Sequence, residues 1–169
     1  MIRVLYDTNV VSYWMKGQQE FHAPLRKLQH DMRGAKAVLY VSAVTIQELA
    51  VAGQMSGSWA EWHDWIRERF NSLPFTTLCA EKAAALQVAV GKPSKGTKSE
   101  SRAAKDLWFR DAAIVGTAIA EGFDMVVSTE KGFRGYQNHF DGEIRIVEPV
   151  AVVGAAPASS TPAGSPSRQ

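Results

Sequence analysis

The sequence predicts an α/β fold built on a parallel sheet of about five strands. Two observations support this class. Short apolar runs with β-branched residues alternate along the chain with longer helical patterns, the order typical of parallel sheets. The chain has 169 residues, of which 46% are hydrophobic and 21% are charged, as in an ordinary soluble domain. Its one cysteine, Cys79, excludes an internal disulfide and a thiolate zinc cage.

The first part of the chain begins with a predicted buried strand at Ile2–Tyr6, which ends in the polar turn Asp7-Thr8-Asn9. Helices are expected at Val10–Met15 and at about Gln19–Met32. The apolar run VLYV at Val38–Val41 predicts the second strand. This order of strand, helix and strand is that of a parallel crossover unit.

The middle of the chain predicts a helix at Thr45–Gly53 and another at Trp59–Phe70. The second helix carries apolar side chains at steps of three and four residues, which predict a stripe facing the core: Trp59, Trp62, Ile66 and Phe70. We expect a third strand at Phe75–Cys79 and an alanine-rich helix at Glu81–Val90.

The last part begins with Gly91–Ala104, whose two glycines and one proline predict a loop. A helix follows at Lys105–Gly122, and strands are predicted at Asp124–Thr129 and Glu143–Val147. From Ala151 to Gln169 the chain is rich in alanine, serine, proline and glycine, so we expect a disordered tail. The predicted domain therefore spans residues 1–150 and the tail spans residues 151–169.

Neither a membrane segment nor an export signal is expected. No apolar run of signal-peptide length precedes Asp7, and the apolar run Ala112–Ala120 is far shorter than the ~20 residues that span a bilayer. The four histidines are scattered without metal-ligand spacing, and a net charge of +2 neither demands nor excludes an anionic partner. We expect a soluble, cytoplasmic protein.

Polar residues follow three of the predicted strands, where open parallel sheets bind their ligands. The first group is Asp7 and Asn9, and the last is Ser128, Thr129 and Glu130. The middle group is Ser42, Thr45 and Glu48. Because the carboxyl ends of parallel strands share one edge, these groups are candidates for one site.

The helix at Lys105–Gly122 carries two aspartates that face different surroundings. At about 100° per residue, Asp106 shares a polar arc with Arg110, which lies roughly 40° away. Asp106 is therefore expected to face solvent, to pair with Arg110 or to cap the helix. Asp111 falls near 140°, within an apolar arc, and a buried carboxylate is costly unless it is paired or binds metal. That arc consists of Leu107, Trp108, Ile114, Val115, Ala118 and Ile119.

Glu48 has two interpretations. Thr45 and Glu48 fit a capping box, in which a threonine N-cap pairs with a glutamate three residues later. Glu48 also lies beside the same sheet edge as Asp7 and Asp111. Carboxylates 4 Å apart repel by about 4 kcal/mol at an effective dielectric of 20, so such a cluster calls for a proton or a hard cation. Oxygen ligands suit Mg²⁺ or Mn²⁺, which can activate water and neutralise charge on a phosphodiester.

Four short motifs carry most of these residues in order along the chain. They are LYDTNVV at Leu5–Val11, VSAVTIQEL at Val41–Leu49, DAAIVGTAIAEG at Asp111–Gly122 and VVSTEKGF at Val126–Phe133. In order and spacing they resemble PIN-domain ribonucleases, in particular the VapC-like toxins of bacterial toxin–antitoxin pairs. The resemblance extends over roughly residues 1–150. It implies a three-layer α/β/α sandwich and cleavage of RNA that depends on Mg²⁺ or Mn²⁺.

The resemblance also implies roles for individual residues. Asp7, Glu48 and Asp111 become the three principal acids, which hold the metal. Glu130 takes a fourth catalytic position, at which the family usually has Asp or Asn.

Further roles are expected around these acids. Ser128 stands where the family often has a threonine hydroxyl, and Asn9 is expected to support Asp7. The implied partners are an RNA substrate, a cognate antitoxin and a second copy in a homodimer. Basic residues outside the acid cluster are expected to guide the RNA backbone: Lys92, Lys95, Lys98, Lys131 and Arg134.

Three alternatives remain open from the sequence. An RNA-processing relative would keep the nuclease activity without an antitoxin. A phosphatase or phosphotransferase of the aspartyl-phosphate kind would use Asp7 as nucleophile, although the acid expected two residues later is replaced by Asn9. A catalytically silent binding module would use the acids only as caps and ion-pair partners, and its stability would not respond to divalent ions.

Overall fold

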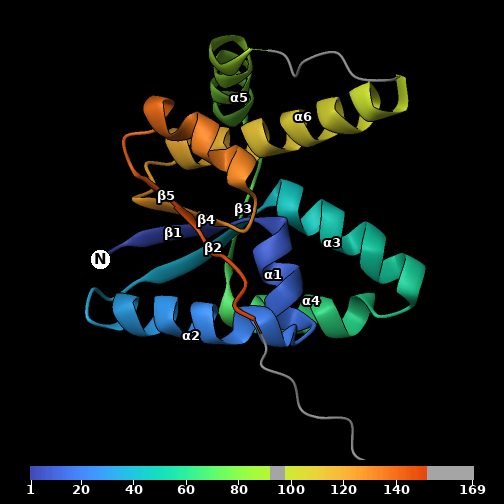
Figure 1. Cartoon of the computed structure of the whole chain (residues 1–169), viewed down its shortest axis with the longest axis vertical. Coiled ribbons are helices and arrows are strands. Elements are labelled where there is room, and N and C mark those ends of the chain that lie inside the picture. Colours follow the sequence, from blue (N-terminus) through green and yellow to red (C-terminus); the bar gives the residue numbers. More distant parts are fainter. Residues whose placement is uncertain (92–97, 152–169) are drawn as a thin grey trace, which may run out of the picture.

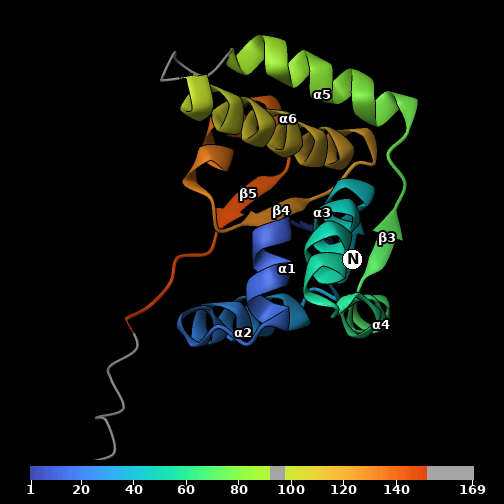
Figure 2. The ribbon, with the colours of Figure 1, turned by 90° about the vertical axis from the view of Figure 1, so that its right-hand side faces the viewer.

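A fully parallel sheet forms the centre of the molecule (Figures 1 and 2). Its strands lie in the order β3-β2-β1-β4-β5, so that β1 is central and the chain crosses from β1 to both sides. The strands are β1 (Arg3–Tyr6), β2 (Val38–Ser42), β3 (Asn71–Leu73), β4 (Met125–Ser128) and β5 (Glu143–Ile146). The computed structural model describes the backbone of residues 1–91 and 98–151 and the side chains of residues 1–91 and 106–151.

One face of the sheet is covered by the helices of the first half of the chain (Figure 2). These are α1 (Thr8–Met15), α2 (Gln19–Arg33), α3 (Ala43–Ser56) and α4 (Trp59–Arg69). Val4 and Tyr6 of β1 are fully buried against Leu25 of α2 and Ile66 of α4. Three residues of the predicted apolar stripe face this core, since Ile66 and Phe70 are buried and Trp59 packs against the cluster. The fourth, Trp62, is not part of this core and lies under the ammonium group of Lys16, while Trp65 packs on the core instead.

The opposite face is covered by helices from the second half of the chain. They are α5 (Thr77–Val90), α6 (Lys98–Ala120) and the 3₁₀ helix η1 (Lys131–His139). Leu5 and Val126 of the sheet contact this layer, which buries Ile114 and Val115 of α6. Two helical layers on one parallel sheet confirm the α/β fold and the three-layer α/β/α sandwich.

Two predicted elements are corrected. The third strand is not Phe75–Cys79 but Asn71–Leu73, and Thr76 instead caps α5 by accepting a hydrogen bond from the Cys79 amide at 3.3 Å. This strand lies at the edge of the sheet and has exposed side chains, so no apolar pattern marks it. The predicted loop Gly91–Ala104 is partly helical, because α6 begins at Lys98.

The remaining predictions agree with the structure to within a few residues at the helix ends. The tail from residue 152 and residues 92–97 of the predicted loop lie outside the described residues. Among the helices that the structure describes, none combines the length and the apolar character needed to span a membrane.

Candidate active site

The strand register brings the ends of three strands to one level. Tyr6, the last residue of β1, pairs with Val41 on one side and with Val127 on the other. A polar residue comes directly after each of these three paired residues. Because of the register, the three polar residues lie at the same edge of the sheet: Asp7, Ser42 and Ser128. The backbone amide of Asp7 donates to the carbonyl of Val127 at 2.9 Å, which fixes Asp7 beside β4.

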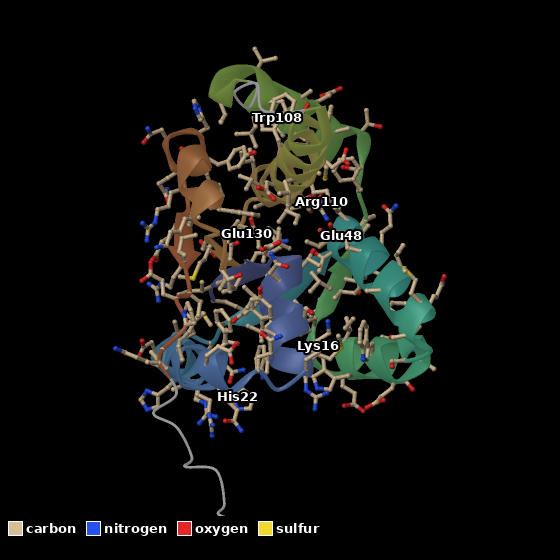
Figure 3. All side chains as sticks on the ribbon, turned by 45° about the vertical axis from the view of Figure 1, so that its right-hand side comes forward. Lys16, His22, Glu48, Trp108, Arg110 and Glu130 are labelled. Atoms are coloured by element: carbon tan, nitrogen blue, oxygen red, sulfur yellow. The ribbon has the colours of Figure 1, made fainter. Side chains whose placement is uncertain are left out.

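At this edge lies a pocket of about 160 Å³ into which four acids project. We call it the acid pocket. Its acids come from four separate segments of the chain, and Figure 3 shows Glu48 and Glu130 on its two sides. The lining residues are Asp7, Thr8, Asn9, Glu48, Leu107, Arg110, Asp111, Ile114 and Glu130.

The carboxylate of Asp7 accepts two hydrogen bonds, and the residue is only 4% exposed. As the N-cap of α1, its Oδ1 accepts a hydrogen bond from the Thr8 amide at 2.7 Å. Its Oδ2 accepts one from the Ser128 hydroxyl at 2.8 Å. The Ser128 hydroxyl accepts in turn from the Glu130 amide at 3.0 Å. Both carboxylate oxygens are thus oriented by groups at the ends of β1 and β4.

Asp111 reaches the acid pocket from the opposite layer. It is half-buried on α6, and the side chains one turn further along the same face, Ile114 and Val115, are fully buried. Gly116 lets α6 approach α5 closely, since a Cβ there would stand 2.6 Å from the backbone nitrogen of Ala83. The helix is therefore fixed against its neighbours over the residues that carry Asp111.

The two glutamates at the rim are engaged by other side chains. The Thr8 hydroxyl donates to Glu48, and the guanidinium of Arg110 forms an ion pair with the same carboxylate (Figure 3). On the other side, the Asn9 amide donates to Glu130. Asn9 thus contacts the acid of β4 rather than Asp7, which is what we expected it to support.

Burial raises the pKa of Asp7 to about 7. The hydrogen bonds from Ser128 and Thr8 oppose this rise in pKa, whereas the nearby charges of Glu130 and Glu48 add to it. Without a bound cation, Asp7 therefore keeps its proton to a higher pH than an exposed aspartate does.

Burial likewise raises the pKa of Asp111, to about 8. The negative charge of Asp7 is the next cause, followed by that of Glu130. Arg110 lowers the pKa of Asp111, and Glu48 raises it further. The raised pKa values of these two inward-facing acids show that the acid pocket holds too little positive charge to offset two ionised carboxylates.

The donor set fits a hard divalent cation. All its strong donors are carboxylate oxygens, the ligands that Mg²⁺ and Mn²⁺ prefer. In the described part of the chain, no three His, Cys, Asp or Glu side chains are grouped closely enough to hold an ion together. Glu48 is engaged by Thr8 and Arg110, and Glu130 by Asn9. Asp7 and Asp111 would hold the ion from within, and Glu48 would join them from the rim, where it also pairs with Arg110.

Three local expectations from the sequence are wrong. Thr45 is not the N-cap of α3, because Ser42 caps that helix by accepting from the Thr45 amide at 3.1 Å. Glu48 therefore belongs to no capping box. Asp106 does not cap α6, which begins at Lys98, although Asp106 does face solvent as expected. Arg110 pairs with Glu48 instead of the Asp106 carboxylate.

Sequence reasoning missed four residues that line the acid pocket: Thr8, Leu107, Arg110 and Ile114. A signal existed for Thr8, which lies between two candidate residues. None existed for Arg110, because its partner Glu48 is 62 positions away in the chain.

The predicted RNA-binding residues do not line the acid pocket where the structure describes them. Lys131 and Arg134, on η1, both form ion pairs with Glu148, at 3.6 and 3.5 Å. Lys92 and Lys95 lie outside the described residues. Lys98 is the first residue of α6, and its side chain is not among those described.

Comparison with known proteins decides the family. A family profile described as PIN domain matches residues 4–138, which include every acid of the pocket. The chain belongs to the PIN domain family. Among curated protein sequences, none is similar enough to this PIN domain to count as a match.

Solved structures with the same fold include chains of toxin–antitoxin complexes. One is VapBC2 from Rickettsia felis bound to a DNA fragment from its promoter, with 18% identity, a TM-score of 0.59 and coverage of 85% of this chain and 98% of that one. Another is a toxin–antitoxin complex from Klebsiella pneumoniae, with 17% identity, a TM-score of 0.59 and coverage of 87% of this chain and 99% of that one. A third is DNA-bound VapBC from Salmonella typhimurium, with 19% identity, a TM-score of 0.57 and coverage of 88% of this chain and 98% of that one. At these identities the similarity establishes the fold of the PIN domain.

Proposed function

We propose that this PIN domain is an endoribonuclease that depends on Mg²⁺ or Mn²⁺ and acts as the toxin of a toxin–antitoxin pair. The observation that carries the proposal is the pair Asp7 and Asp111. Asp7 follows the central strand β1 and Asp111 lies on α6, yet both face one small pocket, and their pKa values are raised to about 7 and about 8. Such a pair is costly unless a cation compensates its charge.

Asp7, Asp111 and Glu48 would hold the ion. When bound, the ion supplies a Lewis acid that activates water for attack on a phosphodiester and stabilises the developing charge. The Ser128 hydroxyl and the Thr8 amide hold the Asp7 carboxylate in one orientation.

Glu130, kept in place by the Asn9 amide, is the fourth acid in our proposal. It lies across the acid pocket from Glu48 (Figure 3). There its carboxylate can accept the proton that the attacking water loses and then give it to the leaving oxygen.

The size of the acid pocket suits a phosphodiester group rather than a whole nucleotide, since ligand sites for larger molecules have volumes of roughly 300 Å³ or more. The nucleotides on either side of the cut would therefore lie outside it. We propose that basic side chains beyond the pocket bind their phosphates. The candidates are Lys92, Lys95, Lys98, Lys131 and Arg134.

The toxin role rests on the fold shared with chains of VapBC complexes. It carries three further proposals: a cognate antitoxin as protein partner, a homodimer and a place in the cytoplasm. Coexpression separates this role from that of an RNA-processing nuclease. Growth arrest on expression, relieved by a protein encoded beside this one, is the expected result. A protein that cleaves RNA without arresting growth would contradict the toxin role alone.

Cleavage of a total RNA pool tests the nuclease. Purified protein should cut RNA with Mg²⁺ or Mn²⁺ present, and excess chelator should stop the reaction. Sequencing the new ends would show whether cuts are internal, as the term endoribonuclease requires. Cleavage that proceeds equally in chelator would contradict the metal dependence.

A further inference from the structure

A second pocket adjoins the acid pocket and shares a wall with it. Its volume is about 330 Å³, about twice that of the acid pocket, which is about 160 Å³. The shared wall consists of Glu48 and Arg110, the ion pair that joins α3 to α6. The other lining residues lie on α3: Val44, Gln47 and Val51. We call this the α3 pocket.

The lining of the α3 pocket combines apolar surface with a few polar groups. Val51 is 55% exposed and therefore offers apolar surface to a ligand in this pocket. Gln47 is also exposed, and its carboxamide can both donate and accept hydrogen bonds. Pockets that bind small organic molecules typically combine apolar walls with a few polar groups.

Arg110 adds a planar surface that is held in position. One of its terminal nitrogens is paired with Glu48, and its Nε donates to the backbone carbonyl of Asp106 at 3.3 Å. Its side chain is still 43% exposed, so other atoms of the guanidinium are accessible. Planar guanidinium groups stack on bases in single-stranded RNA, whose edges are read by amide side chains.

We propose that the α3 pocket binds the base of a nucleotide next to the cleaved phosphodiester, and that Gln47 reads the edge of that base. This inference rests on the proposed ribonuclease function. Because the two pockets share a wall, one nucleotide can place its phosphate at the acids and its base on α3. The base stacks on Arg110 and contacts Val44 and Val51, while the Gln47 carboxamide distinguishes one base from the others.

Gln47→Ala provides the first test, and Gln54→Ala on the same helix is its matched control. Gln54 is also exposed, lies two helical turns away and does not line the pocket. In sequenced cleavage ends, the wild type should favour one base at a position next to the cut. Gln47→Ala should weaken that preference by about three- to tenfold, as expected for the loss of a hydrogen bond. Gln54→Ala should keep the wild-type profile.

Binding provides a second test that does not depend on cleavage. Short single-stranded RNAs that differ in one base are titrated, with Mg²⁺, against Asp111→Asn protein with and without Gln47→Ala. Gln47→Ala should reduce the differences in affinity among these RNAs, and Gln54→Ala should not.

The two readouts separate failure of the inference from failure of the proposed function. If the wild type cleaves RNA but Gln47→Ala matches Gln54→Ala in cut sites and affinities, the α3 pocket does not bind a base. That result is also expected if the pocket serves a protein partner instead. If the wild type does not cleave but Gln47→Ala alters base-dependent affinity, the base pocket stands and the nuclease does not. Absence of both effects overturns both.

Discussion

Asp7 and Asp111 have the same chemistry but are supported differently. Asp7 has a hydrogen-bond donor on each carboxylate oxygen, from Thr8 and Ser128, whereas Asp111 has only the charge of Arg110 to offset its neighbours. Burial raises the pKa of both acids, and hydrogen bonds oppose that rise only at Asp7. The supporting groups therefore set the pH at which each acid becomes available as a ligand.

Ser128→Ala tests that relation. Without the Ser128 hydroxyl, the pKa of Asp7 should rise, because the hydrogen bond that favours its charged form is lost. The pH at half-maximal Mn²⁺ binding should then increase by roughly one unit. Isothermal titration at a series of pH values measures this shift. Ser56→Ala, at the far end of α3, is the control and should leave the midpoint unchanged. An unchanged midpoint in Ser128→Ala would contradict the role of this hydrogen bond.

Some residues of the acid pocket can be predicted from the sequence, and others cannot. Asp111 stands out because its position on the helix is otherwise apolar. Glu48 is obscured by a capping pattern that the chain does not use, since Ser42 caps the helix three residues before Thr45. The contact between Arg110 and Glu48 depends on how α6 crosses α3, and no local pattern records that crossing.

At the scale of elements, those whose stability comes from apolar burial are predictable, and those held mainly by backbone pairing are not. The buried strands β1 and β4 and the amphipathic helix α2 are found close to their true bounds. Strand β3 has only three residues, which are little buried, and its position is fixed mainly by backbone pairing with β2. A short edge strand of this kind leaves no periodic signal in the sequence.

Gly116→Ala tests the packing that positions α6. Its new Cβ would lie 2.6 Å from the backbone nitrogen of Ala83, so one helix must move. Urea unfolding should show a loss of about 1–3 kcal/mol in the free energy of unfolding. Gly34→Ala is the control, since that glycine has helical backbone angles and a Cβ added there would meet no atom within 4 Å, so its stability should stay equal or rise slightly. Equal stability of both variants would show that α5 and α6 tolerate a wider spacing.

At the scale of the whole molecule, the acid pocket joins segments from both halves of the chain. Asp7 and Glu48 come from the first half, and Asp111 and Glu130 come from the second. Folding brings the four carboxylates close together, and their mutual repulsion lowers the stability of the folded protein while no cation is bound. The same acids should therefore make both the stability of the folded state and the affinity for metal depend on pH.

Unfolding experiments at several pH values test this coupling. Asp7 and Asp111 have folded-state pKa values above the unfolded value of 3.8, so between about pH 4 and pH 8 the folded state binds more protons than the unfolded state. Their contribution to the stability of metal-free protein should fall as pH rises through that range and level off above it. Asp111→Asn removes one of these acids, so its stability relative to the wild type should increase over the same range.

The stabilisation by Mg²⁺ should show the opposite trend. The ion binds deprotonated carboxylates, so the Mg²⁺-induced rise in Tm should be greater at about pH 9 than at about pH 6. A Tm that responds to Mg²⁺ equally at both pH values, or not at all, would argue against a carboxylate metal site.

The most direct test of the central claim compares two aspartates on one helix. RNA cleavage rates in Mg²⁺ are measured for the wild type, Asp111→Asn and Asp106→Asn. Asp111 faces the acid pocket and Asp106 faces solvent, yet both substitutions replace a carboxyl group on α6 with a carboxamide. We expect Asp111→Asn to lose cleavage by at least about 100-fold while remaining folded, and Asp106→Asn to cleave at the wild-type rate. Cleavage by Asp111→Asn at the wild-type rate would contradict the assignment of the acid pocket as the active site.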